Sequence, residues 1–171
     1  EAIEKWLDRF MALTTYEISC PVMRDATLAP AGKTGLVISM LFDYGLTKSI
    51  EQAGWYEEFK NYVDARIIET LDGSIFPGIK NAIIHQFSST PLTIEKFSGN
   101  FQGAITGWAH NNDPIPAESR IPKIMNAVKT PIPGVFQAGQ WTYSPSGLPI
   151  SLLTGKISAD QVIKELKKAQ K

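Results

Sequence analysis

The sequence predicts an α+β fold in which helices pack against one mixed or antiparallel sheet. Its 171 residues suit a single domain with a core of its own. Hydrophobic residues make up 43% and charged residues 20%, the balance of an ordinary globular protein. Stretches with helical periodicity are interspersed with short apolar runs, and this order of elements favours the α+β class.

The first 42 residues predict a helix followed by two strands. Apolar side chains recur at helical spacing over residues 3–13, so we expect a short amphipathic helix there. Residues 16–20 have the pattern of a strand, which Pro21 ends. The run LVISMLF at 36–42 is apolar throughout, and this favours a central strand that is buried on both faces.

The middle of the chain predicts three helices and one strand. Helical periodicity over 46–71 is interrupted at Gly54, so we expect a shorter helix before this glycine and a longer one after it. A strand is expected over 82–88. A short helix opens at Thr90-Pro91, because proline is tolerated in a first helical turn.

The last third of the chain is rich in turn-forming residues and closes with a helix. Glycine and proline recur through 98–134, which predicts a long irregular connection of the kind that usually has a function. A short apolar strand is expected over 135–141. The closing helix is expected over 149–168, where a basic last turn complements the helix dipole.

Charge and cysteine content argue against several classes of function. Lys plus Arg and Asp plus Glu number 17 each, so the chain lacks the basic excess of a nucleic-acid binder or a polybasic membrane anchor. Cys20 is the only cysteine, and His85 and His110 lie far apart, so we expect neither an internal disulfide nor a metal site. No apolar run approaches the roughly 20 residues of a membrane span. The expected location is therefore cytoplasmic, or peripheral to a membrane.

The segment 133–163 reads as a strand, a tight turn and a helix. At Gly139 the missing side chain would let another group approach the backbone. The loop Ser144-Pro145-Ser146-Gly147 leads to Pro149, where the closing helix begins, and the first N–H groups of a helix suit a phosphate, a carboxylate or a carbonyl oxygen. An ordinary corner between a strand and a helix is the alternative interpretation.

This segment resembles the C-terminal flavin-binding segment of the phytoene desaturase and carotenoid isomerase branch of the amine-oxidase-like flavoproteins. There the segment reads glycine, Asp or Gln, an aromatic residue, a glycine-rich loop, a hydrophobic residue with proline, and a helix with Ser/Thr-Gly-Lys/Arg. The matching positions are Gly139, Gln140, Trp141, residues 144–147, Leu148-Pro149 and Thr154-Gly155-Lys156. Upstream segments occur in the family's order at 25–33, 77–79, 90–108 and 130–141.

Two departures from the family pattern stand out. The usual Pro-Gly-Gly-Gly loop is Ser-Pro-Ser-Gly here, so that Gly147 alone keeps its place, and Gln140 stands where Asp is common. The sequence also lacks the G-x-G-x-x-G turn with which a Rossmann unit holds the ADP half of FAD. The resemblance therefore implies the C-terminal part of a longer FAD-dependent oxidoreductase, whose N-terminal Rossmann domain would be its partner.

The resemblance also implies a role for each part of the chain and a reaction. Residues 1–130 would be a substrate-domain-like region, and residues 131–171 would complete the FAD-binding domain as its flavin-contacting corner. The longer protein would transfer hydride between an apolar substrate, such as a polyene or a lipid, and FAD. The 171 residues alone would bind FAD weakly or not at all and would be inactive.

The candidate site residues follow from the same corner. We expect contacts to the cofactor through backbone donors and the helix N-terminus, at Gly139, Gln140, Gly147, Leu148 and Pro149. Three aromatic residues, Trp108, Trp141 and Tyr143, could line a tunnel for the apolar substrate, with core packing as the alternative. His110 is either an acid–base group or a solvated loop histidine, and no catalytic residue is assigned.

A second class of function remains open at this point. The chain could be a non-catalytic domain whose apolar groove binds a lipid, a peptide or a partner protein. The fewer glycines in the loop and the missing Rossmann half favour this alternative. A G-x-G-x-x-G motif upstream of Glu1 in the reading frame would favour the flavoprotein instead.

Overall fold

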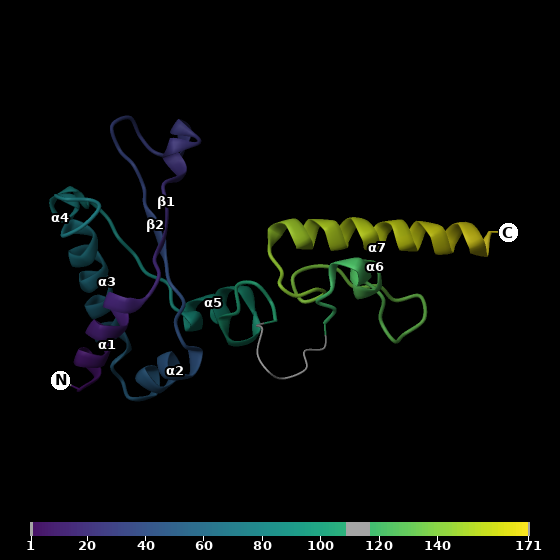
Figure 1. The fold of residues 1–171 in the computed structure, drawn as a ribbon, viewed down its shortest axis with the longest axis horizontal. Helices are drawn as coiled ribbons and strands as arrows, with labels where there is room; N and C mark the ends of the chain where they lie inside the picture. The colour runs from purple at the N-terminus through teal and green to yellow at the C-terminus, as the bar shows by residue number, and fades with distance from the viewer. Residues whose placement is uncertain (1, 109–116, 171) are drawn as a thin grey trace. The chain divides into compact units, whose positions relative to one another are not determined.

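The computed structural model describes residues 2–108 and 117–170 and divides into two compact units, residues 1–92 and 93–171 (Figure 1). The length of the chain predicts one domain, whereas the contacts within the chain separate two parts. The division between residues 130 and 131 rests on the family resemblance and stays a prediction. None of the described helices is both long and apolar enough to cross a membrane.

The first unit is built around three long helices. These are α1 (Ala2–Leu13), α2 (Tyr44–Gln52) and α3 (Tyr56–Asp72), so the helices predicted over 3–13 and 46–71 are confirmed. Gly54 lies between α2 and α3 with a φ of 75°, a backbone conformation that glycine adopts without strain. Asp43 caps α2, because its carboxylate accepts a hydrogen bond of 2.6 Å from the Leu46 N–H.

A two-stranded antiparallel sheet joins α1 to α2. Strands β1 (Glu17–Ser19) and β2 (Val37–Ser39) pair with Ile18 opposite Ile38, and two single 3₁₀ turns, η1 (Pro21–Met23) and η2 (Ala26–Leu28), lie in the connection between them. The prediction of a strand buried on both faces over 36–42 is wrong. Regular pairing covers only three of these residues, and Leu41 is 86% exposed. An apolar run predicts a strand, but it does not say whether another element covers both of its faces.

The core of the first unit lies where α1, α2 and α3 meet. Leu7 and Met11 of α1 pack with Ile50 of α2 and with Phe59 and Val63 of α3, and all five are buried. Partly buried hydrophobic side chains pack around this cluster. They are Phe10, Tyr16, Met40, Phe42, Leu46, Trp55, Tyr62 and Ile67. The apolar stripes that predict the helices are therefore the stripes that form the core.

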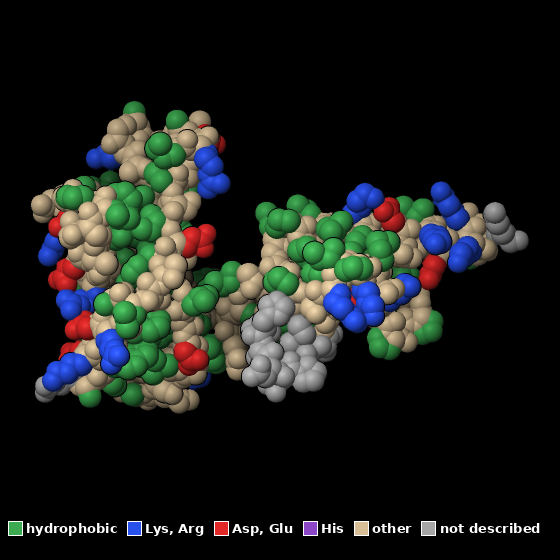
Figure 2. Space-filling model, viewed as in Figure 1, with side chains coloured by type: hydrophobic (Ala, Val, Ile, Leu, Met, Phe, Trp, Pro, Cys, Tyr) green, Lys and Arg blue, Asp and Glu red, His purple; other side chains and the backbone are tan. Residues whose placement is uncertain are grey.

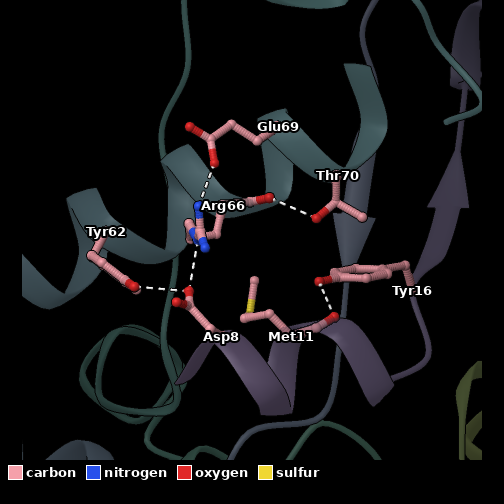
Figure 3. Close-up of polar contacts among 7 residues, drawn as sticks. All are labelled: Asp8, Met11, Tyr16, Tyr62, Arg66, Glu69 and Thr70. Carbon is pink, nitrogen blue, oxygen red and sulfur yellow. Dashed lines mark hydrogen bonds and ion pairs between the residues drawn. The ribbon is translucent and has the colours of Figure 1, made fainter. Parts of the chain in front are cut away.

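Polar contacts reinforce the junction of α1 and α3 (Figure 3). The Asp8 carboxylate accepts hydrogen bonds from Tyr62 Oη at 2.8 Å and from Arg66 Nε at 2.7 Å, and Arg66 also donates to Glu69 at 2.6 Å. The hydrogen bonds from Arg66 and Tyr62 hold the pKa of Asp8 below its ordinary value of 3.8. Tyr16 Oη donates to the Met11 carbonyl, which joins the end of α1 to the residue before β1.

The strand predicted over 82–88 is not formed. The short helix α4 (Ile79–Ala82) ends at the start of this stretch, and residues 83–90 have no regular structure. Ile84 and Phe87 are 77% and 84% exposed, so the apolar side chains that suggest a strand find no core within the described residues. The predicted helix from Thr90-Pro91 is confirmed as α5 (Pro91–Ser98), which spans the boundary between the units.

The second unit consists of irregular chain held against one long helix. Its short elements are η3 (Phe101–Gly103), η4 (Ile121–Lys123) and α6 (Ile124–Ala127), and its last element is α7 (Leu148–Ala169), which confirms the predicted closing helix. The strand predicted over 135–141 is wrong. Among the described residues, this stretch forms only an isolated antiparallel bridge, between Phe136 and Lys129.

Candidate functional site

The corner that leads into α7 is the part of the chain that sequence reasoning assigns to a ligand. Gly147 precedes the helix in an extended conformation with a φ of 168°, and Pro149 lies in the first turn. No side chain among the described residues caps this end of the helix. The first N–H groups of α7 therefore keep their capacity to donate, and the positive end of the helix dipole lies beside them.

A buried threonine attaches Gly139 to this helix. The Gly139 N–H donates to Thr154 Oγ1 over 3.1 Å, and Thr154 is completely buried. The same hydroxyl lies 2.9 Å from the Ile150 carbonyl and 3.1 Å from the Ser151 carbonyl. It can donate its one proton to either of these two carbonyls. The backbone at Gly139 is thereby fixed relative to the first two turns of α7.

Gly139 itself adopts a conformation that favours glycine. Its φ is 104°, and a Cβ built on it would find no atom within 4 Å. A Cβ on Gly147 would meet only Pro149 Cδ, at 3.9 Å. The space beside both backbone positions is therefore open, which is the condition for another group to approach them.

Hydrogen bonds from two buried residues, Thr142 and Ser144, hold the loop between these two glycines. Ser144 is completely buried; its Oγ donates to the Trp108 carbonyl at 3.0 Å, and its N–H donates to the Glu118 carbonyl at 3.0 Å. The N–H of Thr142, also buried, donates to the Gly139 carbonyl at 3.1 Å. Ser146 Oγ is buried and has no hydrogen-bond partner within the part of the chain that the structure describes.

The structure brings two of the predicted substrate-lining aromatic residues together. The rings of Trp108 and Trp141 meet edge to face with centroids 5.2 Å apart, and Trp108 Nε1 donates to the Trp141 carbonyl at 2.9 Å. Both side chains are partly exposed. Tyr143 is buried, with 3% exposure, and its hydroxyl donates to the Ser119 carbonyl at 2.9 Å. The substrate-lining role of all three residues stays a prediction.

Sequence reasoning missed the close packing of Gly107 on Gln140. Gly107 has a φ of 75°, and a Cβ built on it would collide with the Gln140 carbonyl oxygen. Glycine is therefore required at this position on two grounds, conformation and space. The only signal in the sequence was one more glycine in a stretch that already contains many.

Glu118 is an acidic residue whose backbone is hydrogen-bonded to this loop, because its carbonyl accepts from the Ser144 N–H. Its carboxylate accepts from the N–H groups of Ser119 and Arg120 at 3.1 and 3.0 Å, and from Arg120 Nε at 3.3 Å. The Arg120 N–H is the largest of the influences that lower the pKa of Glu118. The carboxylate thus holds the turn at residues 118–120. The carbonyls of this turn accept hydrogen bonds from the Tyr143 hydroxyl and the Ser144 N–H.

These features offer hydrogen-bond donors at one end of a helix. The uncapped N–H groups at the start of α7 lie beside open backbone at Gly139 and Gly147, where an anion or a carbonyl oxygen could accept from them. Leu148 is 75% exposed at the same place. No group of three or more His, Cys, Asp or Glu side chains that could hold a metal occurs in the described part of the chain. His110 lies outside the described residues.

The sequence is similar to carotenoid-modifying proteins. It is 27% identical to prolycopene isomerase 2, chloroplastic, of an Oncidium hybrid cultivar over 159 residues, which cover 87% of this chain and 24% of that protein. It is 28% identical to 4,4'-diapophytoene desaturase (4,4'-diaponeurosporene-forming) of Staphylococcus aureus strain Newman over 151 residues, which cover 86% of this chain and 28% of that protein.

These similarities span nearly the whole chain but only part of each relative. The chain corresponds to about a quarter of the length of the relatives it matches. No protein-family model matches the sequence. No solved structure matches it either. The comparisons thus support a distant relationship to a portion of the carotenoid isomerases and desaturases.

Proposed function

We propose that this chain is the C-terminal part of an FAD-dependent oxidoreductase that acts on a long apolar polyene. The similarity to an isomerase and a desaturase of carotenoids supports the class of substrate. The observation that carries the proposal is the corner at α7, where Thr154 fixes Gly139 beside an uncapped helix N-terminus and leaves the backbone of Gly139 and Gly147 open.

Each part of the corner has a separate task in this proposal. The first N–H groups of α7, at Leu148 and Ile150, would donate to an oxygen of the cofactor, where the helix dipole favours negative charge. Gln140 would offer its amide to the ribityl or phosphate region. Ser144 and Thr154 would not touch the cofactor; they hold the loop in the geometry that keeps Gly139 and Gly147 open.

FAD, when bound, would accept a hydride from the substrate or return one to it. This chain would contribute position and polarity to that step. The paired rings of Trp108 and Trp141 would give the substrate an apolar surface next to the loop. The hydroxyls of Tyr143 and Ser144 are buried in hydrogen bonds to backbone carbonyls, which keeps these two polar groups off that surface.

The test uses the protein encoded by the whole reading frame. The reading frame upstream of Glu1 should encode a G-x-G-x-x-G turn, and the purified protein should show the visible absorbance of bound flavin or gain it on addition of FAD. Under anaerobic conditions, an apolar polyene should bleach this absorbance, while a polar analogue of similar size should not. A colourless protein that fails to take up added FAD would overturn the proposal.

Exposed apolar side chains favour one other candidate function. Phe97, Phe101 and Ile105 are 84%, 68% and 65% exposed in the second unit, which is the composition of a surface that binds a lipid, a peptide or a partner protein. A non-catalytic domain with this role would leave the full-length protein colourless and still able to bind lipid vesicles or a partner. The absorbance measurement therefore separates the two candidates.

A further inference from the structure

Gly107 and Trp108 make three separate contacts with the loop that follows Gly139. A Cβ built on Gly107 would collide with the Gln140 carbonyl oxygen, so the two backbones lie in close contact there. The Trp108 indole N–H donates to the Trp141 carbonyl at 2.9 Å. The Trp108 carbonyl accepts a hydrogen bond of 3.0 Å from Ser144 Oγ. Trp108 is thus joined to the loop through both its side chain and its backbone.

The shape of this loop depends on individual contacts of this kind. Residues 139–147 lie outside every helix and strand of the described chain and form only a single bridge, between Glu118 and Tyr143. Regular backbone pairing therefore does not fix their path. The contacts of Trp108 fall on Trp141 and on Ser144, in the part of the loop that connects Gly139 to Gly147.

Its hydrogen bonds distinguish Trp108 from a residue that only lines a tunnel. Figure 2 shows hydrophobic side chains exposed over much of the second unit, so apolar surface alone does not set Trp108 apart. The ring of Trp108 meets the ring of Trp141 edge to face at 5.2 Å, and its N–H donates to the backbone of the same residue. Trp141 is therefore held at two points, its ring and its carbonyl oxygen.

We propose that Trp108 is a positioning residue for the cofactor. Through its indole N–H and its carbonyl it holds residues 140–144 in the conformation that presents the open backbone of Gly139 and Gly147 to FAD. Trp108 acts through the loop, without contact with FAD. The inference rests on the proposed function and adds a task toward the cofactor to the apolar surface that Trp108 offers the substrate.

Replacement of one atom of Trp108 tests the inference in the protein encoded by the whole reading frame. The tryptophan analogue benzothienylalanine, in which sulfur takes the place of the indole N–H, replaces Trp108 and keeps the shape of the ring. Loss of one hydrogen bond that shapes the site raises the dissociation constant of FAD roughly 2- to 10-fold. The visible bands of the bound flavin shift, because the polar groups around the cofactor move. The control places the same analogue at Trp55, which packs on the core of the first unit.

Hydrogen exchange on the purified protein measures the contact without reference to flavin. With the analogue at position 108, the amide hydrogens of Thr142 and Ser144 exchange roughly 2- to 10-fold faster, since the loop opens more easily. Gln137, whose N–H donates to the Val128 carbonyl outside the loop, keeps its rate. Ser144→Ala removes the other hydrogen bond of Trp108 and accelerates exchange at Thr142 in the same way, which decides the question where the analogue disturbs the fold.

The possible results separate the two proposals. An unchanged dissociation constant for FAD with the analogue at position 108 would overturn the inference and leave the proposed function standing, even where exchange in the loop is faster. Equal weakening of FAD binding by the analogue at Trp55 would overturn it too, because the effect would then be general. A parent protein that takes up no FAD would overturn the proposed function and the inference with it.

Discussion

Removal of the Thr154 hydroxyl should destabilise the second unit and loosen the corner. The hydroxyl is completely buried and is the acceptor for the Gly139 N–H. Thr154→Val preserves shape and volume but leaves that N–H, which is partly buried, without its partner. An unsatisfied buried donor costs about 1–3 kcal/mol, so we expect the free energy of unfolding of this unit to fall by that amount. Thr154→Ser keeps the hydroxyl, so its free energy of unfolding should fall by less than that of Thr154→Val.

Tryptophan fluorescence can follow the second unit alone. Trp6 and Trp55 lie in the first unit, and Trp108 and Trp141 in the second. With Trp6 and Trp55 replaced by Phe in every variant, urea titration reports the unfolding of the second unit, and the slope of the free energy with urea shows whether the transition stays cooperative. The reasoning is refuted if Thr154→Val unfolds at the urea concentration of the parent, or if Thr154→Ser is the less stable of the two.

Three further predictions follow from single residues. Gly107→Ala should destabilise the second unit by about 1–3 kcal/mol or more, measured by the same urea titration, because alanine would be strained at a positive φ and its Cβ would collide with the Gln140 carbonyl oxygen. Gly147→Val in the full-length protein should abolish flavin retention, measured by visible absorbance, and leave the fold intact, because the extended backbone there suits valine. Asp8→Asn should remove a pH-dependent part of the stability of the first unit. Since contact with Arg66 and Tyr62 lowers the pKa of Asp8, its contribution is present above the ordinary value of 3.8 and lost as pH falls through the lower folded value, so thermal unfolding of the variant should depend less on acidic pH.

Each of these predictions has a control and an outcome that contradicts it. Gly99 has a φ of 70° with no atom within 4 Å of a built Cβ, so Gly99→Ala carries the conformational strain alone and should cost less than Gly107→Ala. Equal losses would mean that the contact with Gln140 contributes nothing. Unchanged flavin content in Gly147→Val would place the cofactor elsewhere. An acid transition of Asp8→Asn identical to that of the parent would show that the contacts of the Asp8 carboxylate with Arg66 and Tyr62 in Figure 3 do not contribute to the pH dependence of stability.

The helices could be predicted from the sequence because each has an apolar stripe that some element covers. The stripe with Leu7 and Met11 predicts α1 and meets the stripe with Phe59 and Val63 that predicts α3. Periodicity does not say which of two apolar faces is covered within the chain, however. In α7 the face with Ile157 is buried and the face with Leu152 is 67% exposed at that residue, and nothing in the local pattern distinguishes them.

The strands were predicted less well because a strand depends on a partner that its own sequence does not specify. Residues 82–88 and 135–141 each hold four hydrophobic residues of seven and the run at 36–42 holds six, and only the last contains a paired strand in the described residues. Exposure of Phe87 to 84% shows that apolar character alone does not bring a segment into a sheet.

The sequence predicts a candidate site at the corner before α7, but not the contacts that hold this corner. The motif around Gly139 and Gly147 points to the corner at α7, while the hydrogen bond from Gly139 to Thr154 and the packing of Gly107 on Gln140 join residues distant along the chain. Such contacts depend on the path of the loop between them, and short-range pattern does not encode that path. Thr154 matches the helix motif of the family that the sequence resembles, but its role in holding the corner is visible only in three dimensions.

The flavin content of the purified full-length protein tests the central claim most directly. The account predicts a visible flavin spectrum, with one FAD released for each chain on denaturation, and its loss in Gly147→Val. A folded full-length protein that is colourless as purified, and that remains colourless after incubation with FAD and removal of the excess, would contradict it.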